Sequence, residues 1–534
     1  MKFINSVPNA SETYPRFILW AVFFFVASVY AVFLMTGDVQ EDALITFRTA
    51  LNFADYGDLS FNLGEHYSGA TSYLYPIWIA LIRKAAGEFV IPAVLVINSL
   101  VVLGAAYLFA NLVSQVLGAY DNKKAMLRAW VAIALTPIAV LVSIRGMEAV
   151  YVILFFIIGL YLIRRHPQHY LSYLPILVLP LVRPDAIAFS CILAGFAFFH
   201  SRQIGIRYVF AAVFGLLLLF ALNYLIFGSV IPTTAQAKAV GVIDSRSLGE
   251  IASGIVRLYF SSALFSPFSS KYLIPLYPFF SVLAIVFSVS LFVWAWRTGS
   301  KCFPVIAAIL AGIWLVPGAF SLGGVVFPWY LWPSKFLYQA VFVSVLVAII
   351  WNQKSKLMAI ARGAFVVLIA TILMYQLLLS YNKGRQEMGF RASVGKYIAS
   401  IAKPGDSLFL EPAGYIPYYA RLKTIDEVGL TSAAVLKFKR SHPENWWIQA
   451  VKSNRPTFLV QRDHILENKT YQGATLESAD ADWLWENYGI VKTFTYNPND
   501  WAASEWLRWV LRRGSHASYH LLQLREAQNV NEGE

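Results

Sequence analysis

The sequence has little charge and almost no cysteine. Only 14% of its 534 residues are Asp, Glu, Lys or Arg, whereas about one-quarter of the residues of soluble globular domains are charged. A chain of this composition cannot cover itself with a water-soluble surface, which excludes a string of soluble domains. The two cysteines, Cys191 and Cys302, lie far apart in or beside apolar segments. The sequence therefore contains neither a disulfide framework nor a cysteine metal motif.

Apolar residues are abundant instead. They make up 58% of the chain, and the mean hydropathy is +0.57. A spanning helix needs about 20 mostly apolar residues. The pattern predicts an α-helical polytopic membrane protein, with apolar segments near 17–36, 70–86, 90–117, 127–143, 148–163, 170–182, 184–199, 206–227, 272–296, 303–320, 335–351 and 358–380.

The basic residues predict how these segments are oriented. Lys and Arg outnumber Asp and Glu by 43 to 30, a net charge of +13. In a membrane protein such residues mark cytoplasmic loops rather than a nucleic-acid partner. All the short basic loops fall on one side only if segment 70–86 does not cross, so we expect that segment to be re-entrant or interfacial. The loops contain Lys123, Lys124, Arg128, Arg164, Arg165, Arg202, Arg207, Arg297, Lys301, Lys354 and Lys356.

The chain then crosses the membrane eleven times. The first segment lacks a small-residue cleavage site, and we interpret it as a retained signal anchor with a cytoplasmic N-terminus. An odd number of crossings places the C-terminus outside. We expect a transmembrane catalytic domain over 1–380, with long outer loops at 37–89 and 228–271. The hydrophilic residues 381–534 contain short strand-like runs at 407–410, 457–460 and 491–496, which predict a soluble extracytoplasmic α/β domain.

Ionisable residues gather at the outer ends of the predicted spans. Each alone has an ordinary explanation, as a helix-terminal charge or a solvated turn. Their common location argues against a channel or a transporter, whose key polar groups lie within the spans. Cations at this level can stabilise a lipid-linked phosphate as it leaves, and a carboxylate can take a proton from an acceptor hydroxyl. The residues are Glu41, Asp42, Arg145, Glu148, Arg183, Asp185 and Lys238.

Several segments together resemble polytopic glycosyltransferases of the GT-C class. The resemblance is strongest to the mycobacterial terminal β-(1→2) arabinofuranosyltransferases and the related Gram-negative pilin arabinosyltransferases. This chain has Glu41 where the family often has Asp, Ala186 where it has Gly, and Thr233 where it has Asn. The segments that carry the resemblance are 41–52, 62–72, 145–148, 183–185, 224–238, 411–419 and 425–431.

The resemblance implies a GT-C fold and an inverting transferase. The enzyme would move a sugar, D-arabinofuranose, from a polyprenyl-phosphate donor to a pilin protein or a surface or cell-wall glycan. Asp42 would be the catalytic base, with Glu41 and Glu148 beside it in the catalytic group. The resemblance further implies donor or phosphate contacts at Arg48, Arg145, Arg183 and Lys238, and substrate-lining roles for His66, Tyr67 and Asp185.

Other functions remain open from the sequence alone. A GT-C enzyme could transfer another sugar, such as aminoarabinose or a hexose, to lipid A or protein. A transporter, flippase or scaffold for lipid-linked sugars is the alternative from a different class. We expect no obligatory metal, because Arg and Lys can hold a monophosphate donor without one, although a divalent ion would be compatible. The expected location is the bacterial inner membrane, with the active site and the C-terminal domain on the periplasmic side.

Overall fold

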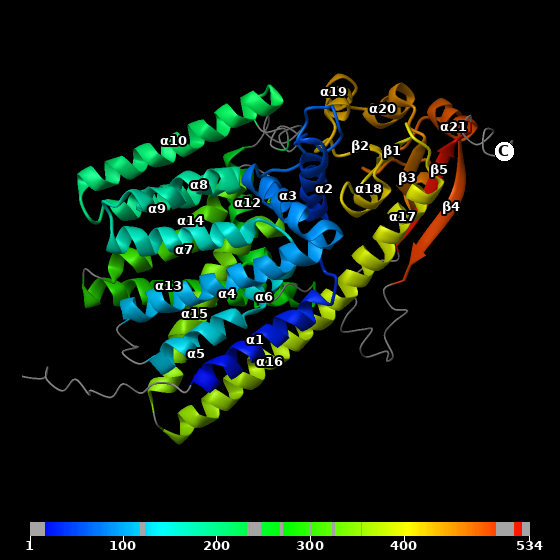
Figure 1. Ribbon diagram of the computed structural model, residues 1–534. Helices are drawn as coiled ribbons and strands as arrows, with labels where there is room; N and C mark the ends of the chain where they lie inside the picture. Colours follow the sequence, from blue (N-terminus) through cyan, green and yellow to red (C-terminus); the bar gives the residue numbers. More distant parts are fainter. Residues whose placement is uncertain are drawn as a thin grey trace, which may run out of the picture.

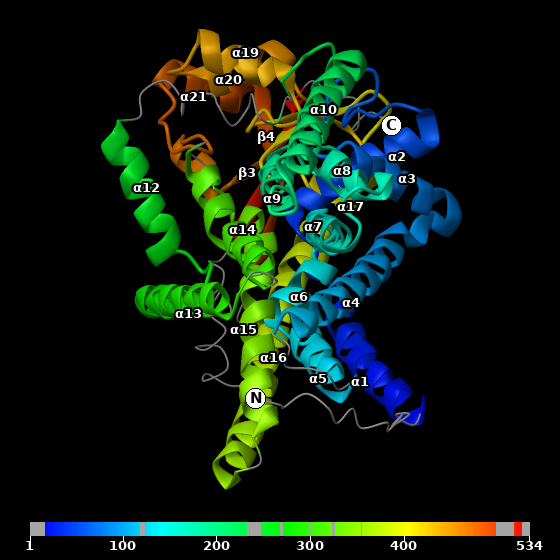
Figure 2. The ribbon, with the colours of Figure 1, turned by 90° about the vertical axis from the view of Figure 1, so that its left-hand side faces the viewer.

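The protein consists of a helical bundle and a C-terminal α/β domain placed on one end of it (Figure 1). The computed structural model describes residues 16–117, 123–231, 234, 247–267, 271–299, 302–322, 326–353, 355–497 and 517–525. In Figure 2 the C-terminal domain lies at the top and the start of α16 at the bottom. The bundle and the domain therefore meet at one end of the long helices.

A helix or a bent pair of helices occupies each segment that was predicted to cross. Within the described part of the chain, six helices are long and apolar enough to span a membrane, or seven if the bent pair α5–α6 is counted as one span. The count of eleven crossings therefore stays a prediction. The bundle helices are α1 (Arg16–Leu34), α4 (Val90–Leu117), α5 (Lys123–Ala134), α6 (Pro137–Ile144), α7 (Ala149–Arg165), α8 (Leu174–Val182), α9 (Ile187–Ala197), α10 (Arg202–Phe227), α13 (Tyr277–Thr298), α14 (Phe303–Leu322), α15 (Trp332–Asn352) and α16 (Lys356–Gly384).

The break between α5 and α6 has a local cause. The two helices meet at 57°. Pro137 has no N–H to continue the hydrogen bonds of α5 and suits the first position of a new helix. The Thr136 hydroxyl caps α6 by accepting the Ala139 N–H at 3.4 Å. The bend directs the end of α6 toward Arg145, where the candidate site begins.

The first long loop is folded as two helices, α2 (Glu41–Tyr56) and α3 (Leu74–Ala86). The segment predicted to be re-entrant or interfacial is α3. Its Tyr75 hydroxyl donates to the Gly146 carbonyl at 2.9 Å and accepts from Asn98 of α4 at 3.1 Å. These contacts hold α3 against the turn before α7, while its position relative to the membrane stays a prediction. The second long loop includes α12 (Leu248–Ser261), and residues 235–246 lie outside the described part of the chain.

The last turn of α7 contacts the end of α4. Arg164 and Arg165, in the last turn of α7, both donate to the Gln115 side chain near the end of α4. This end of the bundle lies away from the C-terminal domain (Figure 1). Arg164 and Arg165 therefore lie at that end of the bundle, and which side of the membrane is cytoplasmic stays a prediction.

The C-terminal domain is built on a mixed five-stranded sheet of order β2-β1-β3-β5-β4. β1 pairs in parallel with β2 and β3, whereas β5 is antiparallel to β3 and β4. Three of the five strands match the strand-like runs seen in the sequence. The strands are β1 (Ser407–Leu410), β2 (Lys423–Asp426), β3 (Phe458–Arg462), β4 (Tyr488–Tyr496) and β5 (Ala517–Leu524).

Both faces of this sheet are buried under helices. Alternate residues of β1 enter different cores: Leu408 and Leu410 pack with α17 (Ala392–Ile401) and α18 (Tyr415–Ala420), while Phe409 packs with Trp447 on the other face. That second face is covered by α19 (Ala433–Ser441), α20 (Trp446–Asn454) and α21 (Ser478–Asn487) (Figure 1). Burial on both faces explains why β1 and the start of β3 are continuous apolar runs rather than alternating ones.

One helical rod joins the bundle to the C-terminal domain. It begins with α16, passes through a π-helical turn at Arg385–Arg391 and continues as α17. Gly384 lies where this rod crosses the loop after α1, because a Cβ there would be 1.6 Å from the Thr36 carbonyl oxygen. Turns of π-helix are rare and are often found at functional sites. Here the turn supplies Glu387 and Arg391 to the junction between the two parts.

Candidate functional site

Asp42 lies at the start of α2, beside the turn that precedes α7. The backbone N–H of Gln40 donates to the Arg145 carbonyl at 3.0 Å, which ties the two segments together. Glu41 and Asp42 occupy the first turn of α2, where acidic side chains interact favourably with the helix dipole. Asp42 is half-buried and lines a small cavity with Ile45, Thr46, Gly69, Thr71, Met147, Glu148, Arg183, Thr234, Trp329, Tyr330 and Leu430.

Glu148 and Arg183 form an ion pair in the wall of this cavity. Glu148 is 4% exposed and its Oε1 lies 3.5 Å from Nε of Arg183. Arg183 is held in two further ways: Asp185 accepts two hydrogen bonds from it at 2.9 and 2.6 Å, and the guanidinium lies 5.0 Å from the ring centre of Tyr330. The charge of the arginine is thus compensated and its orientation is fixed.

One donor of Arg183 remains available. Its Nη1 is buried and makes no hydrogen bond within the described part of the chain. An unsatisfied buried donor costs about 1–3 kcal/mol, so such groups are rare outside functional sites. A ligand hydroxyl or phosphate oxygen in the cavity could accept from it. The cavity thus combines two carboxylates, Asp42 and Glu148, with one available guanidinium donor.

As described, the cavity is narrow. Its volume is about 30 Å³, enough to hold water but far below the roughly 300–1,000 Å³ of typical ligand pockets. A sugar does not fit without movement of at least one wall. The aromatic wall is formed by Trp329 and Tyr330 in the short turn Pro328–Leu331 before α15.

The segments singled out in the sequence converge on this one cavity. Asp42 comes from the first segment, Thr71 from the second, Glu148 and Arg183 from the next two, Thr234 from the fifth and Leu430 from the C-terminal domain. These residues span 388 positions of the chain, from 42 to 430. The structure therefore places residues of these separate segments around one cavity, as their resemblance to one family led us to expect.

A buried carboxylate shapes the wall contributed by the C-terminal domain. Asp426 accepts the backbone N–H groups of Val428, Leu430 and Thr431 at 2.9, 2.6 and 3.1 Å. This fixes the turn that places Leu430 in the cavity. Opposite the turn, a Cβ on Gly69 would lie 2.6 Å from the Thr431 side chain, so only glycine permits this contact.

A second, larger cavity of about 250 Å³ lies beside the first and shares Trp329 with it. Two cations line it. Lys335 is 6% exposed and donates to the Ala263 carbonyl at 2.7 Å, while Arg145 pairs with the buried Asp38 at 3.0 Å and keeps a buried Nε without a hydrogen bond among the described residues. The remaining lining is mostly apolar: Pro137, Ile138, Leu141, Pro267, Pro328 and Trp332, with Gln40 and Gln376.

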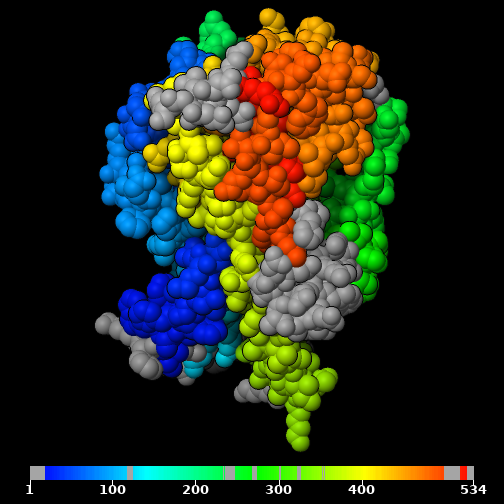
Figure 3. All heavy atoms as spheres, turned by 90° about the vertical axis from the view of Figure 1, so that its right-hand side faces the viewer, coloured from blue at the N-terminus to red at the C-terminus, as the bar shows by residue number. Residues whose placement is uncertain are grey.

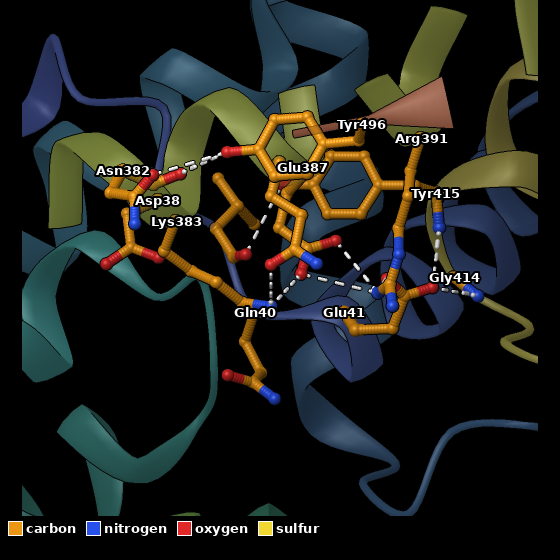
Figure 4. A network of polar contacts seen from close by, with 12 residues as sticks. Asp38, Gln40, Glu41, Asn382, Lys383, Glu387, Arg391, Gly414, Tyr415 and Tyr496 are labelled. Carbon is orange, nitrogen blue, oxygen red and sulfur yellow. Dashed lines mark hydrogen bonds and ion pairs between the residues drawn. The ribbon is translucent and has the colours of Figure 1, made fainter. Parts of the chain in front are cut away.

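Glu41 points away from the cavity, into the junction with the C-terminal domain (Figure 4). Its carboxylate accepts the Arg391 guanidinium at 2.6 Å and the backbone N–H groups of Gly414 and Tyr415 at 2.8 and 3.0 Å. A Cβ on Gly414 would lie 2.3 Å from the Glu41 carbonyl oxygen, so glycine is required for this approach. The predicted place of Glu41 in the catalytic group has no support in this geometry.

Arg391 is shared between Glu41 and Glu387. Burial raises the pKa of Glu41 to about 7, against the opposing effect of Arg391. Burial acts in the same direction on Glu387, but Arg391 and Lys383 outweigh it and hold the pKa of Glu387 below its usual value. Glu387 is thus the more firmly ionised of the two carboxyls around Arg391.

Arg48 also lies outside both cavities. It bridges the first loop and the C-terminal domain through five hydrogen bonds of 2.6–3.2 Å, and its guanidinium stands 4.3 Å from the ring centre of Phe61. With its donors occupied in this way, Arg48 is a structural clamp in the described state. The acceptors are the carbonyls of Phe61, Pro417 and Leu422 and the side chains of Asn62 and Thr424.

The other predicted residues are placed as follows. His66 is exposed in the first loop and Tyr67 is buried, with its hydroxyl donating to the Gly429 carbonyl at 3.2 Å; neither lines the cavity of Asp42. Asp185 does not line that cavity but holds Arg183, which does. Lys238 lies outside the described residues.

Sequence reasoning missed four residues of this region: Trp329, Tyr330, Lys335 and Arg391. The first three belong to a Pro- and Trp-rich turn and to the helix that follows it. A lysine beside aromatic residues at the end of a predicted span was the sequence signal that could have identified them. Arg391 gave no signal, because its partner Glu41 is 350 positions away. Within the described part of the chain no group of three His, Cys, Asp or Glu residues could hold a metal ion, and metal dependence stays a prediction.

Comparisons with known proteins agree with this architecture. A family model described as a domain of unknown function, DUF8728, matches residues 379–516, which correspond to the C-terminal domain. No curated protein sequence matches the chain. The domain match covers too little of the chain to define the family of the whole protein.

Solved structures give the fold of the whole chain. ArnT from Cupriavidus metallidurans bound to undecaprenyl phosphate is similar with a TM-score of 0.52 and 13% identity, over 94% of this chain and 98% of that one. Its apo state gives a TM-score of 0.51 and 14% identity, over 85% and 95%. The oligosaccharyltransferase AglB from Archaeoglobus fulgidus, in complex with an inhibitory peptide and a dolichol-phosphate, gives 0.50 and 12%, over 92% and 75%. The chain is a polytopic helical membrane protein with a GT-C-like fold and a C-terminal mixed α/β domain.

Proposed function

We propose that the protein is an inverting glycosyltransferase that uses a polyprenyl-phosphate sugar. The observation that carries the proposal is the convergence of Asp42, Glu148 and Arg183, from separate segments, on one cavity in a GT-C-like fold. Two proteins with similar folds were solved with a polyprenyl-type phosphate bound: undecaprenyl phosphate in ArnT and dolichol-phosphate in AglB. The same class of carrier is the donor we propose here.

In the proposed reaction, Asp42 is the general base. It takes the proton of an acceptor hydroxyl as that oxygen attacks the anomeric carbon, and the bond from that carbon to the phosphate oxygen breaks. The attack comes from the face opposite the phosphate, so the configuration is inverted. The polyprenyl phosphate leaves with the bonding electron pair and, as a weakly basic anion, needs no strong acid. Glu148 and Nη1 of Arg183 hold sugar hydroxyls beside Asp42.

The second cavity suits the donor's phosphate. Arg145 and Lys335 bring two cations to it, and the partly compensating Asp38 leaves the group positive. The apolar lining suits the first isoprenoid unit, and the shared Trp329 separates phosphate from sugar. Cations fixed beside the leaving phosphate stabilise the negative charge that develops there. Because the narrow cavity has no room for a sugar, donor binding moves at least one wall, and we propose that it is the Trp329–Tyr330 wall.

The finer assignments rest on the sequence resemblance. We propose D-arabinofuranose as the sugar and a pilin protein or a surface or cell-wall glycan as the acceptor. The C-terminal domain would help to bind that acceptor, since its Leu430 lines the cavity. The enzyme would act at the periplasmic face of the bacterial inner membrane.

A donor assay tests the proposal. Purified protein is incubated with undecaprenyl-phospho-D-arabinofuranose and either a pilin or an arabinan acceptor, and release of undecaprenyl phosphate is measured with the glycosylated product. We expect the wild type to release undecaprenyl phosphate when an acceptor is present. Glu148→Gln should lose this activity. Glu88→Gln, the matched change at an exposed surface glutamate, should retain it. Turnover of an aminoarabinose or hexose donor, without turnover of the arabinofuranose donor, would show that the enzyme transfers a different sugar. The absence of turnover with every such donor would contradict the proposed activity.

A further inference from the structure

A long apolar groove lies at the end of the bundle opposite the C-terminal domain. It has a volume of about 640 Å³ and runs between α1, α5, the end of α15 and the middle of α16. Figure 3 shows α1 (dark blue) and α16 (yellow-green) diverging away from the C-terminal domain. The groove belongs to neither cavity of the candidate active site, because none of its lining residues is shared with them.

The groove has the length of one membrane leaflet. It extends from Lys124 to Leu135 along α5 and the residue after it, and from Ile18 to Val29 on α1, a separation of eleven positions in each case. At 1.5 Å per residue these stretches are about 16 Å long. Half of a typical hydrocarbon core is about 15 Å. The groove therefore matches the depth that an acyl chain of a single leaflet occupies.

Charge is confined to one end of the groove. Lys124 and Arg128 are the charged residues that line it, one turn apart on the first part of α5. The rest of the lining consists of aliphatic and aromatic side chains, including Phe25, Trp351 and Phe365. An apolar trough with two cations at its outer end is complementary to a lipid with an anionic headgroup. Basic pockets between transmembrane helices bind such headgroups.

We propose that this groove is a binding site for an anionic glycerophospholipid of the leaflet opposite the C-terminal domain. The phosphate lies between Lys124 and Arg128, and one acyl chain fills the space between α1 and α16. The lipid thereby joins α1, which leads into the loop before α2, to the helix that leads into the C-terminal domain. The site is separate from the donor site and does not depend on the proposed glycosyl transfer.

Lipid binding by the full-length protein tests the proposal. The protein is stripped of lipid in detergent and titrated with phosphatidylglycerol or phosphatidylcholine, with bound lipid measured by native mass spectrometry. We expect tighter binding of phosphatidylglycerol at one site. Since each basic residue near a lipid surface contributes about fivefold in affinity, Lys124→Gln with Arg128→Gln should weaken binding about 30-fold. The control pair, Arg202→Gln with Arg207→Gln, changes two exposed cations of α10 outside the groove and should have no effect.

A second variant tests the apolar part. Ala370→Trp fills the groove from the exposed face of α16, whereas Ala364→Trp changes an exposed alanine of the same helix outside the groove. We expect only Ala370→Trp to displace the lipid and to abolish the rise in thermal unfolding temperature that phosphatidylglycerol produces. Equal affinity for both lipids, unchanged binding in both groove variants, or preferential retention of polyprenyl phosphate would overturn the proposal. A further outcome would also overturn the proposal: a wild-type protein that is a dimer and an Ala370→Trp variant that is a monomer. The groove would then bind a second copy of the chain instead of a lipid.

Discussion

Arg391 donates a hydrogen bond to Glu41 at 2.6 Å across 350 positions of sequence. Glu41 is the first residue of α2, and Asp42 follows it directly. The C-terminal domain therefore fixes the helix turn that presents Asp42 to the cavity. This contact makes Arg391 a positioning residue in our account, acting on the reaction through Glu41 and α2.

The first prediction concerns this contact. Arg391→Gln leaves the buried Glu41 and Glu387 carboxylates without their shared cation, and should lower the free energy of unfolding by about 3 kcal/mol. It should lower kcat more than it raises the donor KM, because Asp42 loses its position. A double-mutant cycle with Glu41→Gln, read by thermal unfolding and by kcat, should show strong coupling. The exposed Lys396→Gln on α17 is the control, and strictly additive effects would remove the positioning role.

The second prediction separates a clamp from a donor contact. Arg48→Lys keeps the charge but cannot reproduce five hydrogen bonds to the loop and the C-terminal domain. We expect a lower unfolding temperature and a loss of about 2–3 kcal/mol in stability. The donor KM of the folded fraction should not change. A raised donor KM with normal stability would restore Arg48 as a phosphate contact.

The third prediction tests the second cavity. Lys335→Gln removes a cation that we place beside the donor's phosphate, and should raise the donor KM by about tenfold or more, since a hydrogen bond to a charged group is worth about 1.5–3 kcal/mol. Lys335→Arg should recover most of the affinity, and Lys356→Gln, at the exposed start of α16, should match the wild type. An unchanged KM in Lys335→Gln would place the phosphate elsewhere.

The fourth prediction is a pH dependence in the C-terminal domain. Glu427 is 1% exposed and accepts a hydrogen bond from Gln461 at 2.5 Å, and burial raises its pKa to about 8. Between its ordinary pKa near 4.5 and pH 8 the folded state keeps the proton and the unfolded state releases it, so stability falls as pH rises. The contribution is at most about 1.4 kcal/mol for each pH unit.

Glu427→Gln carries a permanently neutral group at this position. We expect its unfolding temperature to fall less between pH 5.5 and 8 than that of the wild type, while Glu444→Gln, at an exposed residue, follows the wild type. Parallel pH profiles for the wild type and Glu427→Gln would show that Glu427 is ionised when folded.

The fold could be predicted to a large extent from local patterns. Apolar length placed the bundle helices, and runs such as Ser407–Leu410 placed strands, because both signals depend on neighbouring residues. β2 and β5 were missed. Lys423–Asp426 and Ala517–Leu524 contain polar residues, and they become strands through pairing with β1 and β3, partners that no local pattern identifies.

The site could be predicted only in part. Resemblance singled out Asp42, Glu148 and Arg183, and the structure places all three around one cavity, while their roles stay predictions. It could not distinguish Asp42 from Glu41, because adjacent residues on a helix point about 100° apart and only the packed structure shows which one faces the cavity. Arg48 was assigned to the donor for a similar reason: an arginine that binds backbone carbonyls and one that binds a phosphate look the same in sequence.

The measurement that tests the central claim most directly compares Asp42→Asn with Asp55→Asn. Both residues lie on α2, but Asp55 is 44% exposed and lies outside the cavity. Donor affinity is measured with the purified proteins, and the transfer step is followed in a single turnover after an acceptor is added. We predict that Asp42→Asn binds donor within about threefold of the wild type and transfers about 10²- to 10⁴-fold more slowly, the usual contribution of a general base. Asp55→Asn should behave as the wild type. Transfer by Asp42→Asn at a rate near that of the wild type would contradict the assignment of Asp42 as the base.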